Sequence, residues 1–240
     1  MITLNYKVWC WLKSPWRKRF GIMKLFPEVY YSLFGKKIIS DNISICVPYA
    51  DRKEMLENCF LPAFLNIAKH ANLELVIALP EQEKESIETV LKESGINNYC
   101  IVPIEMKFTR SYYVNMAIDA ATNQAIFICD VDISLPTNLI ELYRKQVGLK
   151  TAWFPICALT KQDGSFDRFY EEGTGLVGFI KKENEHGQWF DETIKTWGNE
   201  DWLFLYKLYE NKIYPIRTFE KTMVHNYHPP VEKRNYEKKW

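Results

Sequence analysis

The stretch AIFICDVD, residues 125–132, decides the fold expected for this chain. Its first five residues form a continuous apolar run of strand length, which leads directly into an Asp-Val-Asp tripeptide. Alternate carboxylates at the end of a buried strand can direct one side chain toward a nucleotide ribose and the other toward a metal ion on its phosphates. The tripeptide alone is a weak motif, because two solvated loop acids are the alternative. Its position after the strand supports the prediction of a ligand site.

Apolar runs and helical patterns alternate before this stretch. Strands are predicted over residues 43–47, 73–79 and 99–104, and helices over residues 51–69, 81–93 and 110–122. This alternation predicts an α/β fold with a mostly parallel central sheet flanked by helices. Ligands of such sheets bind at the carboxyl ends of the strands, where the Asp-Val-Asp tripeptide lies.

Beyond residue 150 the alternation is less regular. The patterns predict strands over residues 152–158 and 176–180, a helix over residues 199–210, and a last strand from residue 214 to near His225. No internal repeat and no low-complexity linker divides the chain. We therefore expect one main domain over residues 42–230, an N-terminal extension over residues 1–41 and an exposed basic tail over residues 231–240.

The composition favours a folded protein. A chain of 240 residues with 47% hydrophobic residues can bury a sizeable core, and the 15% of aromatic residues would fill that core or stack against sugar rings. The six cysteines show no metal-ligand spacing, so we expect a reducing compartment. Because there is no apolar stretch of about 20 residues and no signal-like segment, the sequence predicts a cytoplasmic protein without a membrane span.

The formal net charge of +1 is unevenly distributed. Residues 1–40 contain eight basic residues and one acid, a net charge of +7, whereas the rest of the chain carries −6. Aromatic residues lie among these basic residues, a mixture typical of segments that contact an anionic membrane surface. The extension is therefore predicted to lie at the inner face of the cytoplasmic membrane, with an ordinary packing segment as the alternative. The acidic balance of the main domain argues against nucleic-acid binding.

Two further motifs are candidates for a site. WGNED, residues 197–201, precedes a predicted helix, and its acids are either ordinary charges at a helix start or part of an acceptor site. In the second case a carboxylate would take a proton from a sugar hydroxyl beside the Trp ring. HNYH, residues 225–228, follows the last strand. One of its two imidazoles would complete a metal site begun by Asp132, unless the pair is structural.

Two arginines also follow predicted strands. Arg52 comes after the first strand, and Arg110 lies at the start of the helix after the third. Guanidinium groups suit the oxygens of a diphosphate, although each arginine taken alone is equally typical of a protein surface.

Taken in order, the motifs resemble a known family. They are VPYxxR at residues 47–52, FxR at residues 108–110 with Asn115 downstream, Asp-Val-Asp, GxG at residues 173–175, WGxED and HxxH. This order resembles the β-1,4-galactosyltransferases, and it is similar to the N-acetylgalactosaminyltransferase domains of chondroitin synthases and their bacterial capsule-polymerase relatives. The match covers roughly residues 43–230. The resemblance implies a GT-A catalytic domain, a UDP-sugar donor, Mn²⁺ (or Mg²⁺) and transfer with inversion.

The resemblance also implies roles for individual residues. Pro48, Tyr49 and Arg52 would hold the uracil and ribose, and Arg110 would contact the diphosphate. Asp130 and Val131 would lie at the nucleotide, and Asp132 would bind the metal together with His225 or His228. Further donor contacts would be Asn115, Gly175 and Trp197. Asp201 would be the catalytic base, and Glu200 would contact the acceptor or the donor sugar.

The sequence thus predicts an inverting, metal-dependent glycosyltransferase. It would move a hexose or N-acetylhexosamine, with galactose or N-acetylgalactosamine favoured, from a UDP-sugar to an oligosaccharide or polysaccharide acceptor in bacterial surface polysaccharide synthesis. The alternative is a non-catalytic partner of the same fold in a polysaccharide-assembly complex. A nucleotidyltransferase would need a Gly-rich, Lys-ending phosphate loop after the first strand, and PYADR at residues 48–52 is not one. Trp202 stands where galactosyltransferases have another acid, so the resemblance does not identify the sugars.

Overall fold

The computed structural model describes residues 30, 34–35, 42–171, 173, 175–183, 189–195 and 199–229. The predicted tail and almost all of the predicted extension lie outside these residues. In the part of the chain that the structure describes, no helix is both long enough and apolar enough to cross a membrane.

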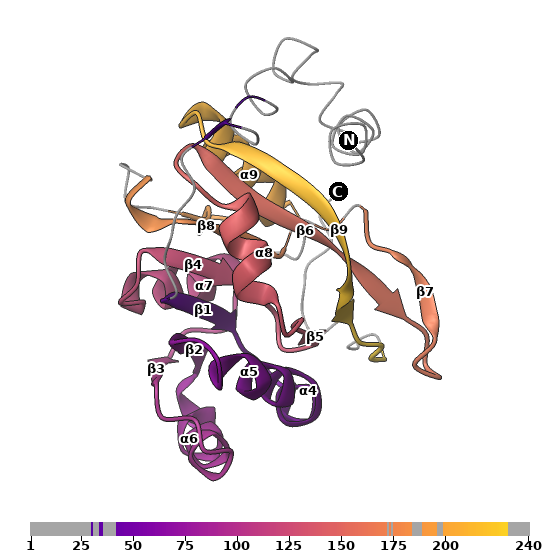
Figure 1. Cartoon of the computed structure of the whole chain (residues 1–240). Helices are drawn as coiled ribbons and strands as arrows, with labels where there is room; N and C mark the ends of the chain where they lie inside the picture. The colour runs from indigo at the N-terminus through magenta and orange to yellow at the C-terminus, as the bar shows by residue number, and fades with distance from the viewer. Residues whose placement is uncertain are drawn as a thin grey trace.

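Four parallel strands form the first half of the central sheet, in the order β3-β2-β1-β4 (Figure 1). They are β1 (Ile43–Pro48), β2 (Leu73–Pro80), β3 (Tyr99–Ile104) and β4 (Ala125–Ile128). The helical segments between them are α4 (Lys53–Met55), η2 (Leu56–Phe60), α5 (Leu61–Ala68), η3 (Glu81–Glu83), α6 (Lys84–Glu93) and α7 (Arg110–Ala120). The predicted strands and helices of this half are confirmed.

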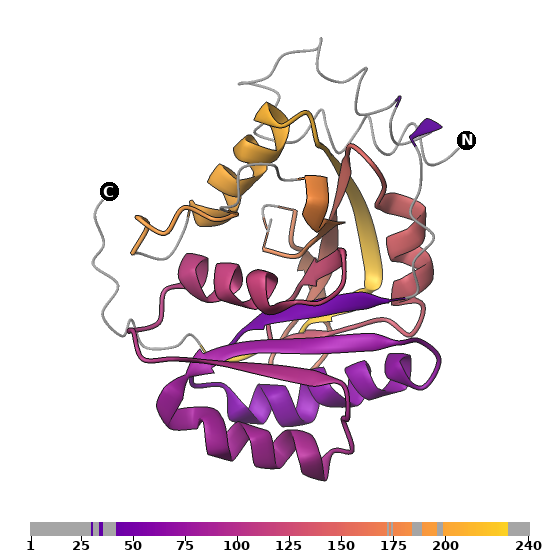
Figure 2. The same cartoon turned by 90° about the vertical axis from the view of Figure 1, so that its left-hand side faces the viewer.

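Apolar residues on both faces of these strands explain why the runs are continuous. Along β1, Ile43 and Ile45 face a core cluster formed with α5 and α6, whereas Cys46 faces a second cluster formed with α7. Successive side chains of a strand point to opposite faces, so a strand covered on both faces is apolar throughout. Figure 2 shows α7 on one side of the parallel strands and α5 and α6 on the other.

The first predicted helix is divided into α4, the π-helical segment η2 and α5. Pro62 lies at the start of α5 and has no N–H to donate to the carbonyl of Asn58, its partner four residues earlier. The helix widens into the π-helical segment η2 just before this proline, where the regular hydrogen bond is missing.

The second half of the sheet continues in the order β8-β6-β9-β5 and is mixed in direction. Its elements are β5 (Ile133–Ser134), α8 (Leu139–Gln146), β6 (Thr151–Thr160), β7 (Phe166–Phe169), β8 (Val177–Ile180), η4 (Lys181–Glu183), α9 (Glu200–Glu210) and β9 (Tyr214–His225). β8 pairs antiparallel with β4 and β6, β9 pairs parallel with β6, and β5 pairs antiparallel with β9. The fold class is confirmed, with the parallel order concentrated in the first half.

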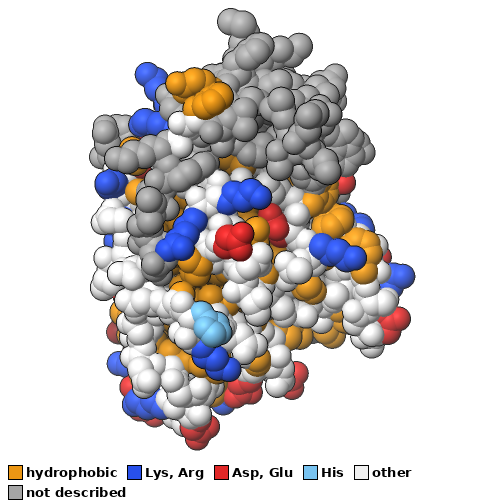
Figure 3. Space-filling model, in the orientation of Figure 1, with side chains coloured by type: hydrophobic (Ala, Val, Ile, Leu, Met, Phe, Trp, Pro, Cys, Tyr) orange, Lys and Arg blue, Asp and Glu red, His pale blue; other side chains and the backbone are white. Residues whose placement is uncertain are grey.

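β7 pairs with β6 and forms a hairpin that projects from the sheet (Figure 1). α8 lies across the face seen in Figure 1, and acidic and basic side chains are interspersed on this face (Figure 3). β5, β7 and α8 are elements that the sequence patterns do not predict.

Candidate active site

Side chains from both halves of the sheet meet after the carboxyl ends of β1, β4 and β9. β1 leads to Arg52, β4 leads to Asp130 and Asp132, and β9 ends at His225. Parallel strands end at the same edge, so the topology brings together Arg52 and His225, which are 173 positions apart in the sequence.

A short piece of sheet holds Asp132 beside His225. In the two-residue strand β5, Ile133 pairs with His225 of β9. The backbone N–H of Asn226 donates to the carbonyl oxygen of Asp132 at 2.8 Å, and the Asn226 side-chain amide donates to the same oxygen at 2.9 Å. These bonds attach the loop after β4 to the end of β9.

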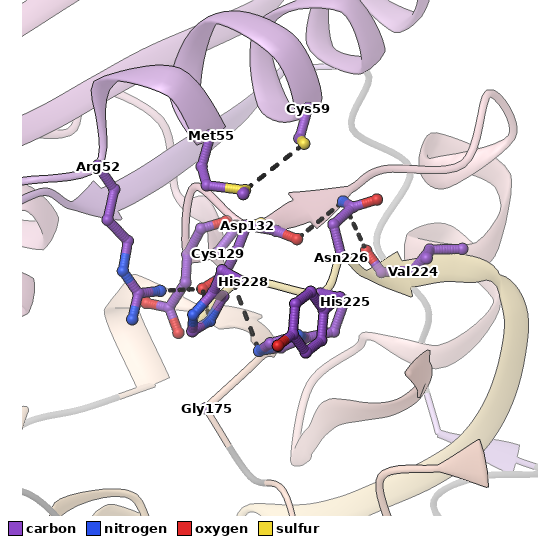
Figure 4. Close-up of polar contacts among 12 residues, drawn as sticks. Arg52, Met55, Cys59, Cys129, Asp132, Gly175, Val224, His225, Asn226 and His228 are labelled. Carbon is purple, nitrogen blue, oxygen red and sulfur yellow. Dashed lines mark hydrogen bonds and ion pairs between the residues drawn. The ribbon is translucent and has the colours of Figure 1, made fainter. Parts of the chain in front are cut away.

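Asp132, His225 and His228 form a cluster with ligand atoms within 4.8 Å of one another (Figure 4). The Nε2 atoms of His225 and His228 lie 3.8 and 3.3 Å from the carboxylate oxygens of Asp132. The second ring nitrogen of His228, Nδ1, lies 3.0 Å from the carbonyl oxygen of Pro229. A carbonyl accepts only, so Nδ1 donates to Pro229. Nε2 faces Asp132: it donates to the carboxylate when the ring is protonated, and it offers a lone pair to a metal ion when the ring is neutral.

The Asp132 carboxylate is 2% exposed and only partly satisfied. One oxygen accepts from Arg52, whereas Oδ1 is buried and has no hydrogen-bond partner among the described residues. Burial raises the pKa of this carboxyl, but the hydrogen bond from His228 and the charges of His225 and Arg52 outweigh it and lower the pKa overall. The hydrogen bond to Asp132 raises the pKa of His228 against the effect of burial. An orphaned buried oxygen beside two imidazoles fits a divalent cation.

Arg110 joins this cluster to the predicted base. Its Nε lies 3.5 Å from Asp130, Nη1 donates to Asp201 at 2.5 Å, and Nη2 donates to the carbonyl of Gly175 at 2.9 Å. The guanidinium also lies 5.9 Å from the ring centroid of Phe190. Arg110 therefore connects the strand end that holds Asp132 with the start of α9.

The pKa of Asp201 is raised to about 6. Burial is the largest cause; the Arg110 charge opposes it, and the carboxylates of Glu200 and Asp130 add to it. A carboxylate with this pKa is ionised at neutral pH yet more basic than an exposed one, which suits a general base.

Other polar groups around Arg110 are buried without a partner. Glu200 is 4% exposed, and its Oε2 accepts no hydrogen bond in the described part of the chain. At the start of α7, the hydroxyls of Thr109 and Ser111 are also buried and unpaired among the described residues. Buried polar groups are normally satisfied, so these groups beside the candidate site have hydrogen-bonding capacity to offer a ligand.

The residues predicted to contact the nucleotide differ in how far they are buried. Tyr49 is buried, and burial together with the neighbouring Glu83 raises the pKa of its phenol. Pro48 ends β1, and Val131 packs in the core cluster beside α5. Arg52 is predicted to be at the uracil and ribose end, and here it donates to Asp132.

Asn115 and Gly175 support the site in different ways. The Asn115 side-chain amide donates to the carbonyl of Phe190 at 3.0 Å and to Glu192 at 2.7 Å, and its oxygen accepts from the Phe190 N–H at 2.8 Å. Asn115 thereby fixes the segment that carries Phe190 under Arg110. A Cβ on Gly175 would lie 3.2 Å from Arg110 Nη2 and 3.3 Å from Asp201, so glycine permits this close approach. Trp197 lies outside the described residues.

Sequence reasoning assigned no role to Asn226, Phe190 or Arg217, which contact the site or its loops. Asn226 had a signal, because it lies inside the HNYH motif between the two histidines. Phe190 and Arg217 lie outside every motif, and only the fold brings them to the site.

No protein-family model matches the chain. N-acetyl-beta-glucosaminyl-glycoprotein 4-beta-N-acetylgalactosaminyltransferase 1 of Mus musculus is 26% identical over 159 residues, 62% of this chain and 15% of that protein. Chondroitin sulfate N-acetylgalactosaminyltransferase 2 of Mus musculus is 24% identical over 219 residues, 78% of this chain and 40% of that protein. The chain thus spans less than half the length of these relatives.

Two solved structures share the fold. The S. aureus TarS structure in complex with UDP-GlcNAc has a TM-score of 0.60 at 12% identity, covering 80% of this chain and 60% of that one. The mannosyltransferase PcManGT of Pyrobaculum calidifontis, in complex with GDP-Man and Mn²⁺, has a TM-score of 0.56 at 16% identity, covering 92% of this chain and 68% of that one. The predicted resemblance is confirmed at this level: the chain has the GT-A glycosyltransferase fold and is a distant sequence relative of N-acetylgalactosaminyltransferases.

Proposed function

We propose that this chain is an inverting, metal-dependent glycosyltransferase that moves a sugar from a UDP-sugar to a carbohydrate acceptor and forms a β-linkage. The names of the sequence relatives favour N-acetylgalactosamine as the sugar, and galactose is the next candidate. The acceptor would be an oligosaccharide or polysaccharide, and the setting bacterial surface polysaccharide synthesis.

One observation gives the strongest support to this proposal. A three-ligand cluster, Asp132, His225 and His228, begins two residues after Asp130. Arg110 connects Asp130 to the carboxylate of Asp201. A transferase needs a charged clamp for the leaving diphosphate and a base for the attacking hydroxyl. The cluster and Asp201 supply both in one connected network.

The donor set indicates which cation fits. One carboxylate and two imidazoles suit Mn²⁺ better than Mg²⁺, which prefers oxygen ligands and keeps most of its waters. A divalent ion bound there would neutralise charge that develops on the departing UDP.

The protein's own groups would complete the reaction. Asp201 would accept the proton of the acceptor hydroxyl while that oxygen forms a bond to the anomeric carbon from the face opposite UDP. The bond from the anomeric carbon to the diphosphate oxygen would break, and UDP would take its electron pair. Arg110 would stabilise the departing diphosphate, and Glu200, next to the base, would contact a sugar hydroxyl.

A screen of UDP-sugars with and without Mn²⁺, with UDP release as the readout, tests this proposal. We expect acceptor-dependent release that requires the ion, with UDP-GalNAc or UDP-Gal as the best donor. UDP binding without turnover on any donor and acceptor would support a non-catalytic partner instead. Release of pyrophosphate from UTP and a sugar phosphate would indicate a nucleotidyltransferase.

The basic extension, residues 1–41, is proposed to bring the domain to an anionic membrane surface. Its net positive charge and interspersed aromatic residues support this. We expect the full chain to co-sediment with vesicles that contain anionic lipid, and a chain without residues 1–36 to remain in the supernatant. Equal sedimentation of the two chains would contradict the proposal.

A further inference from the structure

The loop between β7 and β8, described at residues 170–171, 173 and 175–176, contacts the proposed reaction centre through Gly175. Its Gly175 carbonyl accepts from Arg110, and the Cα of Gly175 faces both Arg110 and Asp201 at close range. A donor sugar attached to a diphosphate near Arg110 would lie against this loop.

A second arginine holds the same loop from the other half of the sheet. Arg217 of β9 is 8% exposed, and its Nη2 donates to the carbonyl oxygen of Gly173 at 2.7 Å. Two carbonyl oxygens of the loop, two residues apart, therefore accept hydrogen bonds from the guanidinium groups of Arg110 and Arg217. Hydrogen bonds from charged donors are stronger than those between neutral groups.

Backbone hydrogen bonds hold Tyr170 and Gly173 at the start of the loop. The Tyr170 N–H donates to the Cys157 carbonyl of β6 at 2.9 Å, and the Gly173 N–H donates back to the Tyr170 carbonyl at 3.3 Å. A Cβ on Gly173 would lie 2.4 Å from the Tyr170 ring, closer than real Cβ atoms approach. A side chain at residue 173 would therefore force the Tyr170 ring or the backbone at Gly173 to move.

We propose that Arg217 is a positioning residue for the donor-sugar pocket. It acts through the Gly173 carbonyl and fixes the backbone that the sugar ring contacts. The inference rests on the proposed function and adds to it a division of the donor site. The cluster around Asp132 holds UDP, and the loop held by Arg217 recognises the sugar.

Titration calorimetry of the full chain with Mn²⁺ tests this division, using UDP and UDP-GalNAc as separate probes. We expect Arg217→Gln to weaken UDP-GalNAc binding about tenfold, the effect of losing one hydrogen bond to a charged donor, and to leave UDP affinity within about twofold. Arg217→Lys keeps the charge and should restore part of the affinity. Gly173→Ala, which displaces the loop without touching Arg217, should reproduce the selective loss.

Arg144→Gln on α8 is the matched control, because it makes the same chemical change on an element outside the loop; both affinities should stay at the wild-type values. Unchanged UDP-GalNAc affinity in Arg217→Gln would overturn the inference, and so would a parallel loss for UDP and UDP-GalNAc, which indicates general unfolding of the site. If Arg217→Gln does not fold, Arg217→Lys and Gly173→Ala decide by the same comparison. A wild-type chain that binds neither probe would instead contradict the proposed function.

Discussion

The two halves of the sheet differ in regularity and in what they contribute to the site. The parallel half, β3-β2-β1-β4, has a continuous register, and β1, β2 and β4 are buried on both faces. The mixed half contains a register shift between Cys157 and Ala158 of β6, a two-residue strand, and a projecting hairpin. Asp132 belongs to the first half, whereas both histidines of the cluster belong to the second.

This difference separates a regular scaffold from the irregular connections that complete the site. The parallel half places carboxylates and arginines at a fixed edge, because its strand ends are set by core packing. The mixed half brings the histidines, Asp201 and the 170–176 loop to that edge through longer and less regular connections. The proposed metal would therefore lie at the junction of the halves. Substitutions at this junction should reduce transfer and metal binding more than substitutions within either half alone.

The largest effect is expected from Asp132→Ala. The change removes the only carboxylate of the described cluster and leaves two imidazoles without their shared partner. Because metal stabilisation of a leaving group is worth several kcal/mol, transfer should fall by about a thousandfold or more, and UDP binding should lose its dependence on Mn²⁺. Calorimetry with and without Mn²⁺ measures this. Asp163→Ala, at an exposed acid in the β6–β7 turn, is the control, and equal behaviour of the two variants would refute the metal assignment.

Asp201→Asn should give the next largest effect and a different pattern. The amide keeps the shape and a hydrogen-bonding oxygen for Arg110 but cannot accept the acceptor proton. Turnover should fall about 10²–10⁴-fold, the usual contribution of a general base. Mn²⁺-dependent UDP binding should stay near the wild-type affinity, because the cluster is intact. Turnover near the wild-type rate would remove Asp201 from the mechanism.

Much of the parallel half could be predicted from sequence, for a physical reason. Its strands are apolar runs of strand length, and its helices are long enough to show a repeating pattern. β5 consists of two residues, so no periodicity exists to detect, and β7 is largely exposed and depends on pairing with β6. The helix α8 had a usable signal: Asn138 precedes it and basic residues occupy its last turn.

The same contrast applies to the site. Asp132 and the HNYH motif could be brought together from the order of motifs, although the sequence left open which histidine was meant, and the structure places both beside Asp132. The pairing of Arg110 with Asp201 spans 91 residues and depends on where α9 docks, which no local pattern encodes. Contacts with backbone carbonyls, such as that of Arg217 with Gly173, do not depend on the partner's side chain, so sequence motifs cannot predict them.

Single removal of each histidine tests whether both belong to the metal site. His225→Ala and His228→Ala should each weaken Mn²⁺ binding about 10–100-fold, at least the loss seen when an outer partner of a metal ligand is removed. His70→Ala, an exposed histidine after α5, is the control. Mn²⁺ affinity can be measured by electron paramagnetic resonance of the free ion. A loss in only one of the two variants would reduce the site to a single imidazole.

The pKa of Asp201 predicts a smaller, pH-dependent effect. The base acts in its ionised form, so the turnover rate should be constant above about pH 7 and should fall as the pH drops through about 6. At pH 5 about one carboxyl in ten is ionised, and the rate should be about tenfold below its plateau. Measurement at saturating Mn²⁺ and UDP-sugar separates this effect from loss of the metal. A rate that is constant down to pH 5 would contradict the raised pKa.

The smallest effect is expected where a single amide joins the halves. Asn226 donates from its side chain to the Asp132 carbonyl and to the Ser134 hydroxyl, both at 2.9 Å, whereas Asn98 donates to the Leu73 carbonyl at 2.9 Å within the parallel half. Each bond contributes about 1 kcal/mol, so Asn226→Ala and Asn98→Ala should both lower the melting temperature by a few degrees. Only Asn226→Ala should also weaken Mn²⁺ binding, by several fold, because it removes one of the two hydrogen bonds that attach the Asp132 carbonyl to the end of β9. Calorimetric melting and Mn²⁺ titration of the two variants decide the point: equal Mn²⁺ affinity in both would mean that the parallel half alone positions Asp132, and that the junction stabilises the fold without shaping the site.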